Sequence, residues 1–190
     1  MLVAGSNPIE LEKDRTQEVC FSSDGSILSA PVESFLQAVR SQLREQVLAF
    51  EPEIASFAEY ALLNQGKQLR PTLVGCAGEA DQGFEPGLVK VAVIIEMIHL
   101  ATLVHDDIMD QAILRRNRPT LCEHSGNEVS VLLGDCLFSR ALELASEFPT
   151  TDVCRLVSQA TRNVCSGEIL QTLRYKKRIL NQENYLRTIR

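Results

Sequence analysis

The stretch from His99 to Thr120, HLATLVHDDIMDQAILRRNRPT, constrains this chain most, because an apolar run ends there in carboxylates and is followed by arginines. A helix turns by about 100° per residue, which places Asp106 and Asp110 one turn apart on one face, with His99 near the same line. Asp107 points away from that line. Two carboxylates at this spacing suit a hard cation such as Mg²⁺, which keeps several waters and bridges to phosphate oxygens.

The arginines after the acids extend the same chemistry. Arg115 and Arg116 offer fork-shaped donors that match the geometry of a phosphate group. Acids and arginines together therefore indicate a site for a metal ion and a diphosphate. A solvated, charged helix end is the alternative. The apolar run from Val89 to Met109 speaks against it, since burying charge there is costly without a ligand. On spacing alone both interpretations stay open.

A second basic segment lies upstream, in QGKQLRPTL at residues 65–73. Gly66 should end one helix, and Pro71 suits the first turn of the next. Lys67 and Arg70 would then lie in a corner between helices, where backbone donors and two cations could converge on an anion. The alternative is a pair of basic residues on the surface.

Four segments, taken in order, resemble the trans-type isoprenyl diphosphate synthases. HDDIMD followed by LRRNRPT is similar to the first aspartate-rich motif of that family, DDxxD with an Arg-Arg pair and Pro-Thr. QGKQLRPTL resembles its GGKxxRP motif, with Gln65 in place of the first glycine. GNEVSVLLGDCLFSRALELA and CSGEILQ resemble its next two helices. The resemblance runs from about Glu33 to the last residue.

The resemblance implies a Mg²⁺-dependent prenyltransferase that condenses isopentenyl diphosphate with an allylic diphosphate. It assigns catalysis to Asp106, Asp110 and Arg115, with the two aspartates as metal ligands. By the same matching, Arg115 serves the allylic diphosphate. The full set of expected substrate-binding residues is Lys67, Arg70, His99, Arg115, Arg116 and Gln171, of which Lys67, Arg70, His99 and Arg116 would hold isopentenyl diphosphate.

Product length follows from the same resemblance. In this family the residues just before the first aspartate form the floor of the pocket that takes the growing chain. Ala101 and Thr102 are both small, and Met97 lies a turn deeper. A ring would fill such a pocket, and overpacking is costly. We therefore expect a medium- to long-chain polyprenyl diphosphate rather than a C10 or C15 product.

One departure from the family concerns the far side of the site. The family's second aspartate-rich motif, and the Lys-Thr pair before it, have no counterpart up to Arg190. We expect residues 31–190 to be the N-terminal portion of a synthase domain. A non-catalytic diphosphate-binding or regulatory subunit, or a truncated fragment, that pairs with a complete synthase is the alternative. A terpene cyclase also carries DDxxD, but Lys67, Arg70 and the arginine pair disfavour it.

Hydrophobic periodicity predicts an all-α fold, an antiparallel helix bundle around a central cavity that is incomplete at the C-terminus. Residues 1–30 show no apolar period and are expected to be a mobile leader. The expected helices cover residues 31–50, 52–64, a segment from 71, a long segment up to 109, and residues 127–147, 152–173 and 182–190.

Composition narrows the class of protein. A net charge of −6 argues against a nucleic-acid partner. Six scattered cysteines are expected to be reduced core residues, which with the lack of a secretory signal favours the cytoplasm. Charged residues interrupt the longest apolar run, so a transmembrane segment is not expected. A homodimer or heteromer is expected.

Overall fold

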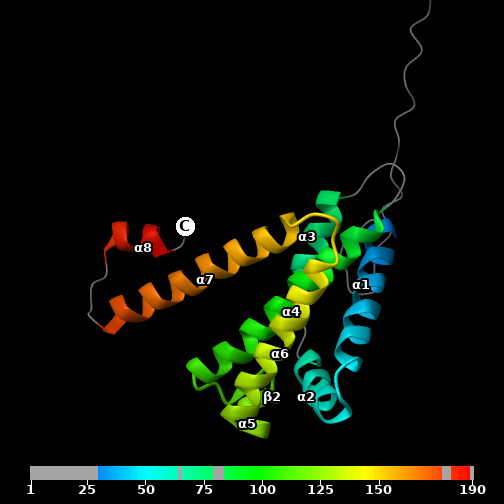
Figure 1. The fold of residues 1–190 in the computed structure, drawn as a ribbon. Coiled ribbons are helices and arrows are strands. Elements are labelled where there is room, and N and C mark those ends of the chain that lie inside the picture. The colour runs from blue at the N-terminus through cyan, green and yellow to red at the C-terminus, as the bar shows by residue number, and fades with distance from the viewer. Residues whose placement is uncertain (1–29, 64–65, 79–83, 177–180, 189–190) are drawn as a thin grey trace, which may run out of the picture.

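The computed structural model describes residues 30–63, 66–78, 84–176 and 181–188. The described part is all-α apart from one two-stranded hairpin (Figure 1). Its elements are α1 (Ala30–Leu48), α2 (Pro52–Leu62), α3 (Leu69–Gly78), α4 (Pro86–Met109), β1 (Leu114–Arg115), β2 (Arg118–Pro119), α5 (Leu121–Ser125), α6 (Asn127–Ser146), α7 (Asp152–Lys176) and α8 (Gln182–Thr188). Except for Ala30, the expected leader lies outside the described residues.

Local sequence signals explain where these helices begin. Pro52 and Pro86 occupy the first turns of α2 and α4, where a missing backbone N–H costs nothing. Thr120 caps α5 by accepting a hydrogen bond from the backbone N–H of Glu123 at 3.4 Å. The expected helices are all present, with ends shifted by a few residues. The short α5 and the hairpin were not predicted, because so few residues carry no periodic signal.

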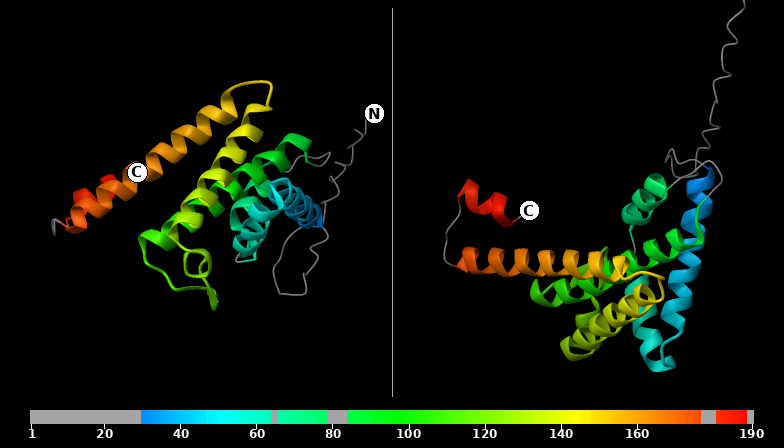
Figure 2. Two further views of the ribbon diagram at one scale, coloured as in Figure 1. Left: turned by 60° about the horizontal axis from the view of Figure 1, so that its bottom comes forward. Right: turned by 45° about the horizontal axis from the view of Figure 1, so that its top comes forward.

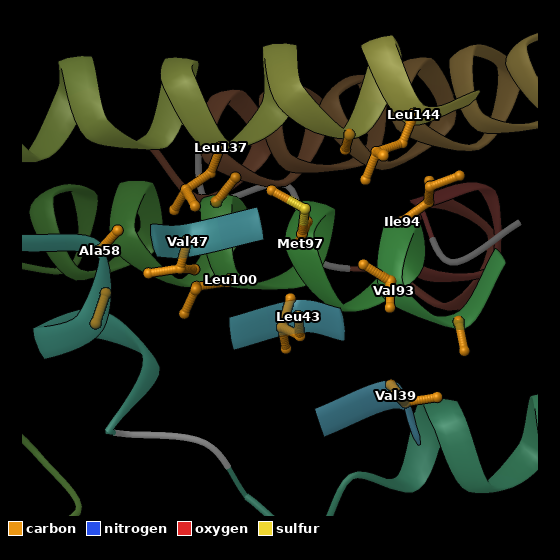
Figure 3. Packing of buried hydrophobic residues seen from close by; sticks show 14 of the residues in the cluster. Val39, Leu43, Val47, Ala58, Val93, Ile94, Met97, Leu100, Leu137 and Leu144 are labelled. Carbon is orange, nitrogen blue, oxygen red and sulfur yellow. The ribbon is translucent and has the colours of Figure 1, made fainter. Parts of the chain in front are cut away.

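The core is built around α4, which packs against α6, α1 and α3. Figure 3 shows side chains from α1, α4 and α6 meeting there, with α6 running antiparallel to α4 in Figure 1. Each fully buried aliphatic side chain contributes about 1.5–3 kcal/mol to this core. The buried residues of α1 recur at helical spacing, as its sequence pattern predicts: Val32, Phe35, Leu36, Val39, Leu43 and Val47.

By length and composition, Gly87–Met109 is the one segment of the described chain that could cross a membrane. Half of an apolar 18-residue window within this segment is buried inside the fold. Its packing against three other helices accounts for its apolar composition, since a helix that is apolar all round is buried in a core.

Beyond its first turns, α7 leaves the bundle and extends past it toward α8 (Figures 1 and 2). Val153, Cys154 and Val157 pack against the core, whereas large apolar side chains further along α7 are exposed. These exposed side chains are Val164, Ile169, Leu170 and Leu173, and Leu156, among the packed positions, is exposed as well. The described part of the bundle therefore leaves apolar side chains of α7 uncovered.

The cysteines are only partly as expected. Cys76, Cys122, Cys136, Cys154 and Cys165 are all free thiols. None of these five is a buried core residue, however: Cys76 and Cys165 are exposed and the other three are half-buried. The expectation of core positions was wrong for them. Cys20 lies outside the described residues.

Candidate active site

The metal-binding candidates lie in the last turn of α4. Asp106 is half-buried and Asp110 is exposed, and neither carboxylate has a hydrogen bond or ion pair with another described residue. Burial raises the pKa of Asp106, and the negative charges of Glu168 and Asp110 raise it further. This concentration of negative charge would be relieved by a cation.

The donors suit a metal ion that is completed by other ligands. No group of three or more His, Cys, Asp or Glu side chains within the described ranges is arranged to hold a metal. Mg²⁺ fits two carboxylates all the same, because it usually binds one or two of them and fills its remaining positions with water and substrate phosphates. Asp106 and Asp110 are the residues that would hold it.

Asp107 is turned away from these two carboxylates and toward Arg115. Arg115 Nε donates to Oδ1 and Oδ2 of Asp107 at 2.9 and 3.1 Å, and Nη2 lies 2.8 Å from Oδ1. The Asp107 side chain is only 7% exposed. The pair fixes the guanidinium of Arg115 beside the acidic end of α4, where it could meet a phosphate group.

The hairpin after α4 carries the second arginine to the other basic segment. Arg116 and Asn117 connect β1 to β2 with φ angles of 52° and 63°, as a two-residue type I′ turn requires. Thr120, which is fully buried, fixes the base of the hairpin by donating to the Ala112 carbonyl at 2.6 Å. The Arg116 guanidinium then lies so close to Gly66 that a Cβ there would collide with it.

A polar pocket of about 110 Å³ forms where these segments meet. Arg40 on α1 supports its edge by donating to the Gln68 side chain at 2.9 Å. Residues 66–70 and Arg116, far apart in sequence, line this pocket together with residues of α4. The lining residues are Gly66, Lys67, Gln68, Leu69, Arg70, Glu96, His99, Leu100, Leu103 and Arg116.

The side chain of His99 lies near several positive charges. Its pKa is lowered to about 4, first by burial and then by the charges of Arg70, Arg115 and Arg116. The imidazole is therefore neutral at pH 7, and the three guanidinium groups act together at one place. Such a field attracts an anion with several charges.

An apolar pocket of about 280 Å³ adjoins the polar one, with His99 and Arg70 lining both. It lies between α4 and α7. Its other lining residues are Ile95, Ile98, Thr102, Val157, Ala160, Thr161, Val164 and Cys165. A ligand with a charged head and a hydrocarbon tail could span the two pockets.

The three residues expected to set the chain length do not lie together in the structure. Thr102 lines the apolar pocket, but Met97 and Ala101 are 0% and 2% exposed within the core and line neither pocket. Helical periodicity explains the difference, because Met97, Ala101 and Val104 share the face of α4 that packs into the core. Met97 and Ala101 therefore line neither of these two pockets, and their place in the pocket floor of a complete synthase stays a prediction.

Three further residues differ from the sequence prediction. Gln171 is exposed on α7 and lines neither pocket. Glu168 was missed, although it lies in the CSGEILQ segment and acts on Asp106. Glu96 was read only as an interruption of the apolar run, and it lines the polar pocket. Sequence alone gave no sign that Glu96 and the basic segment would meet.

His105 and His124 have structural roles. His105 Nε2 lies 3.1 Å from the Val131 carbonyl and packs closely against Gly134 of α6. His124 stacks on Tyr60, with their ring centroids 4.4 Å apart.

Comparisons with known proteins identify related sequences. A family model described as polyprenyl synthetase matches residues 51–190. A prenyl transferase of Synechocystis sp. is 36% identical over 162 residues, covering 84% of this chain and 50% of that protein. A heptaprenyl diphosphate synthase component 2 of Geobacillus stearothermophilus is 35% identical over 155 residues, covering 82% of this chain and 48% of that protein.

A solved structure gives the same likeness in three dimensions. Polyprenyl synthase from Caulobacter crescentus, complexed with calcium and isoprenyl diphosphate, matches with a TM-score of 0.75 and 32% identity, covering 83% of this chain and 48% of that one. The chain thus spans about half the length of the relatives it matches. Because the family model matches most of its residues, the chain belongs to the polyprenyl synthetase family.

Proposed function

We propose that this chain supplies the N-terminal half of the active site of a trans-polyprenyl diphosphate synthase, which condenses isopentenyl diphosphate with an allylic prenyl diphosphate. The observation that carries the proposal is the convergence of Lys67, Arg70 and Arg116 on one pocket that adjoins an apolar pocket at His99. A diphosphate head and a hydrocarbon tail match these two environments.

The reaction breaks the bond between the allylic carbon and its diphosphate, which leaves with the electron pair. The double bond of isopentenyl diphosphate attacks that carbon, and a proton is then lost. Arg115, fixed by Asp107, would stabilise the departing diphosphate as its charge grows. Mg²⁺, when bound to Asp106 and Asp110, would supply further charge neutralisation. Lys67, Arg70 and Arg116 would orient the second diphosphate.

The apolar pocket has the complementary task of excluding water, which would otherwise quench the allylic cation. Small or aliphatic side chains from α4 and α7 line it, including Thr102, Ala160 and Val164. No phenylalanine, tyrosine or tryptophan is among its lining residues. This supports a medium- to long-chain polyprenyl product.

A second candidate is a non-catalytic subunit that keeps one diphosphate site and pairs with a complete synthase. The exposed apolar side chains of α7 favour a covering partner in either case. We propose a homodimer or heteromer. The relative from Geobacillus stearothermophilus is named as one component of a synthase.

Incorporation of radiolabelled isopentenyl diphosphate, resolved by product length, tests the proposal. We expect little or no turnover by the chain alone, and turnover when a polypeptide carrying the second half of a related synthase is co-expressed. An Asp110→Asn chain in the same pairing is the matched control and should be inactive. Unchanged turnover in that control would refute the metal assignment. A lack of turnover in every pairing, with diphosphate binding retained, would favour the non-catalytic subunit.

A further inference from the structure

Glu96 has an unusual position for a carboxylate. It lies one turn before His99 on α4, is 6% exposed, and lines the polar pocket together with Lys67 and Arg70. Its side chain has no hydrogen bond or ion pair with any other described residue. Buried carboxylates are normally paired, because an uncompensated buried charge is costly. The Glu96 carboxyl group is therefore available to a ligand that enters the pocket.

The groups around Glu96 are mostly cationic. Burial raises the pKa of its carboxyl group, and the charge of Arg70 on α3 partly offsets that effect. Lys67 and Arg116 line the same pocket from the segment before α3 and from the hairpin. On its own helix, His99 is neutral at pH 7, because its pKa is about 4.

The other segments packed around Glu96 add few further charges near its carboxyl group. On α1, Arg40 is bound to Glu33 at 2.8 Å and to Gln68 at 2.9 Å, so its charge is partly satisfied. When the pocket is empty, burial disfavours ionised Glu96, and Arg70, one of the nearby cations, partly offsets that penalty. An anion that enters draws on those same cations and also repels the carboxylate at short range.

We propose that Glu96 couples the binding of isopentenyl diphosphate to the uptake of one proton from solvent. With the diphosphate in place, the Glu96 carboxyl group is protonated; its charge no longer opposes the ligand and its O–H becomes a hydrogen-bond donor. The inference rests on the proposed function, because it takes the polar pocket as the isopentenyl diphosphate site. It makes Glu96 a positioning and charge-matching residue.

The sign of the pH dependence follows from linkage. Binding of the anion favours the protonated form, so affinity must fall as the pH rises through the pKa of Glu96 in the empty pocket. Glu96→Gln mimics the protonated carboxyl group and should not show this loss. We expect it to bind about tenfold more tightly than the unaltered chain at high pH, since a coupling of one pKa unit corresponds to that factor. A purely structural role predicts weaker binding instead.

Calorimetric titration with isopentenyl diphosphate, without metal, measures both effects from about pH 5 to about pH 8. Titrations in two buffers of different ionisation enthalpy give the number of protons taken up. The diphosphate titrates identically in all variants, so the difference between the unaltered chain and Glu96→Gln belongs to Glu96. Glu53→Gln, an exposed carboxylate on α2, is the matched control and should behave as the unaltered chain.

The Arg70→Ala variant distinguishes a failure of the proposed function from a failure of the proton coupling. If the unaltered chain binds no isopentenyl diphosphate, or Arg70→Ala binds it equally well, both the proposed function and the coupling are overturned. If Arg70→Ala loses binding while Glu96→Gln keeps the proton count and affinity of the unaltered chain, only the coupling is overturned. Carbon NMR of the Glu96 carboxyl group tests the unaltered chain directly, and its titration midpoint should move to higher pH when the ligand binds.

Discussion

At the scale of single residues, two adjacent carboxylates have opposite environments. Asp107 is bound to Arg115 by two hydrogen bonds and an ion pair, whereas Asp106 is partly buried near Glu168 and Asp110, and the charge of Arg115 offsets their effect only in part. The raised pKa of Asp106 means that the fold disfavours its ionised form, so stability falls as the pH rises through that pKa.

Substitutions should therefore separate stability from metal binding. We expect Asp107→Asn to lower the free energy of unfolding by roughly 2 kcal/mol, because the Arg115 guanidinium loses a charged partner. Asp106→Asn should leave stability unchanged or higher and abolish Mg²⁺-dependent binding of an allylic diphosphate. Thermal unfolding and calorimetric titration measure the two effects. Equal losses of stability in both variants would contradict the assignment.

His99 gives a second prediction at this scale. Its pKa is about 4 in the folded chain and 6.5 when unperturbed, so the unfolded chain binds more protons between those values. The free energy of unfolding should therefore decrease as the pH falls from about 6.5 toward about 4. Proton NMR of the ring should give a midpoint near 4 in the free chain, moving upward when a diphosphate binds. A free-chain midpoint near 6.5 would show that neither burial nor the cations act on His99.

At the scale of elements, two glycines place side chains of one segment against the backbone of another. A Cβ at Gly66 would meet the flexible end of Arg116, and one at Gly134 would meet the ring of His105, which is held by the Val131 carbonyl. Gly66→Ala should reduce affinity for isopentenyl diphosphate about tenfold with little change in Tm, since a guanidinium can shift. Gly134→Ala should instead lower stability by about 1–3 kcal/mol through overpacking. A large loss of Tm in Gly66→Ala would contradict this division.

The two faces of α4 give a further prediction for a complete synthase that contains this sequence. Thr102→Phe should shorten the main product, because its side chain enters the apolar pocket between α4 and α7. Ala101→Phe should destabilise the protein by about 1–3 kcal/mol, because Ala101 lies in the core. Product analysis and thermal unfolding distinguish the two, with Thr102→Val as the control that keeps both properties. A shortened product from a stable Ala101→Phe enzyme would place that residue in the pocket floor.

At the scale of the whole molecule, the exposed side of α7 should make the chain associate. Ile169 and Leu173 lie one turn apart on α7 and are 60% and 49% exposed. Apolar patches of this kind mark interfaces. Sedimentation velocity should show a mass that rises with concentration, and an Ile169→Ser/Leu173→Ser double variant should weaken this. Leu63→Ser, which is exposed next to α2, is the control. If the unaltered chain stayed monomeric at every concentration, an apolar docking face on α7 would be ruled out.

The sequence by itself determined the helices, the order of the motifs and the concentration of carboxylates at the end of α4. These depend on periodicity and on residues within one or two turns of one another, as with Asp106 and Asp110. Only the tertiary structure decided what meets across the chain. It brought Arg116 over Gly66, placed Glu96 in the same pocket as Arg70, and set Thr102 apart from Ala101. Those outcomes depend on the turn of a hairpin and on which face of a uniformly apolar helix packs inward, and no local pattern encodes either one.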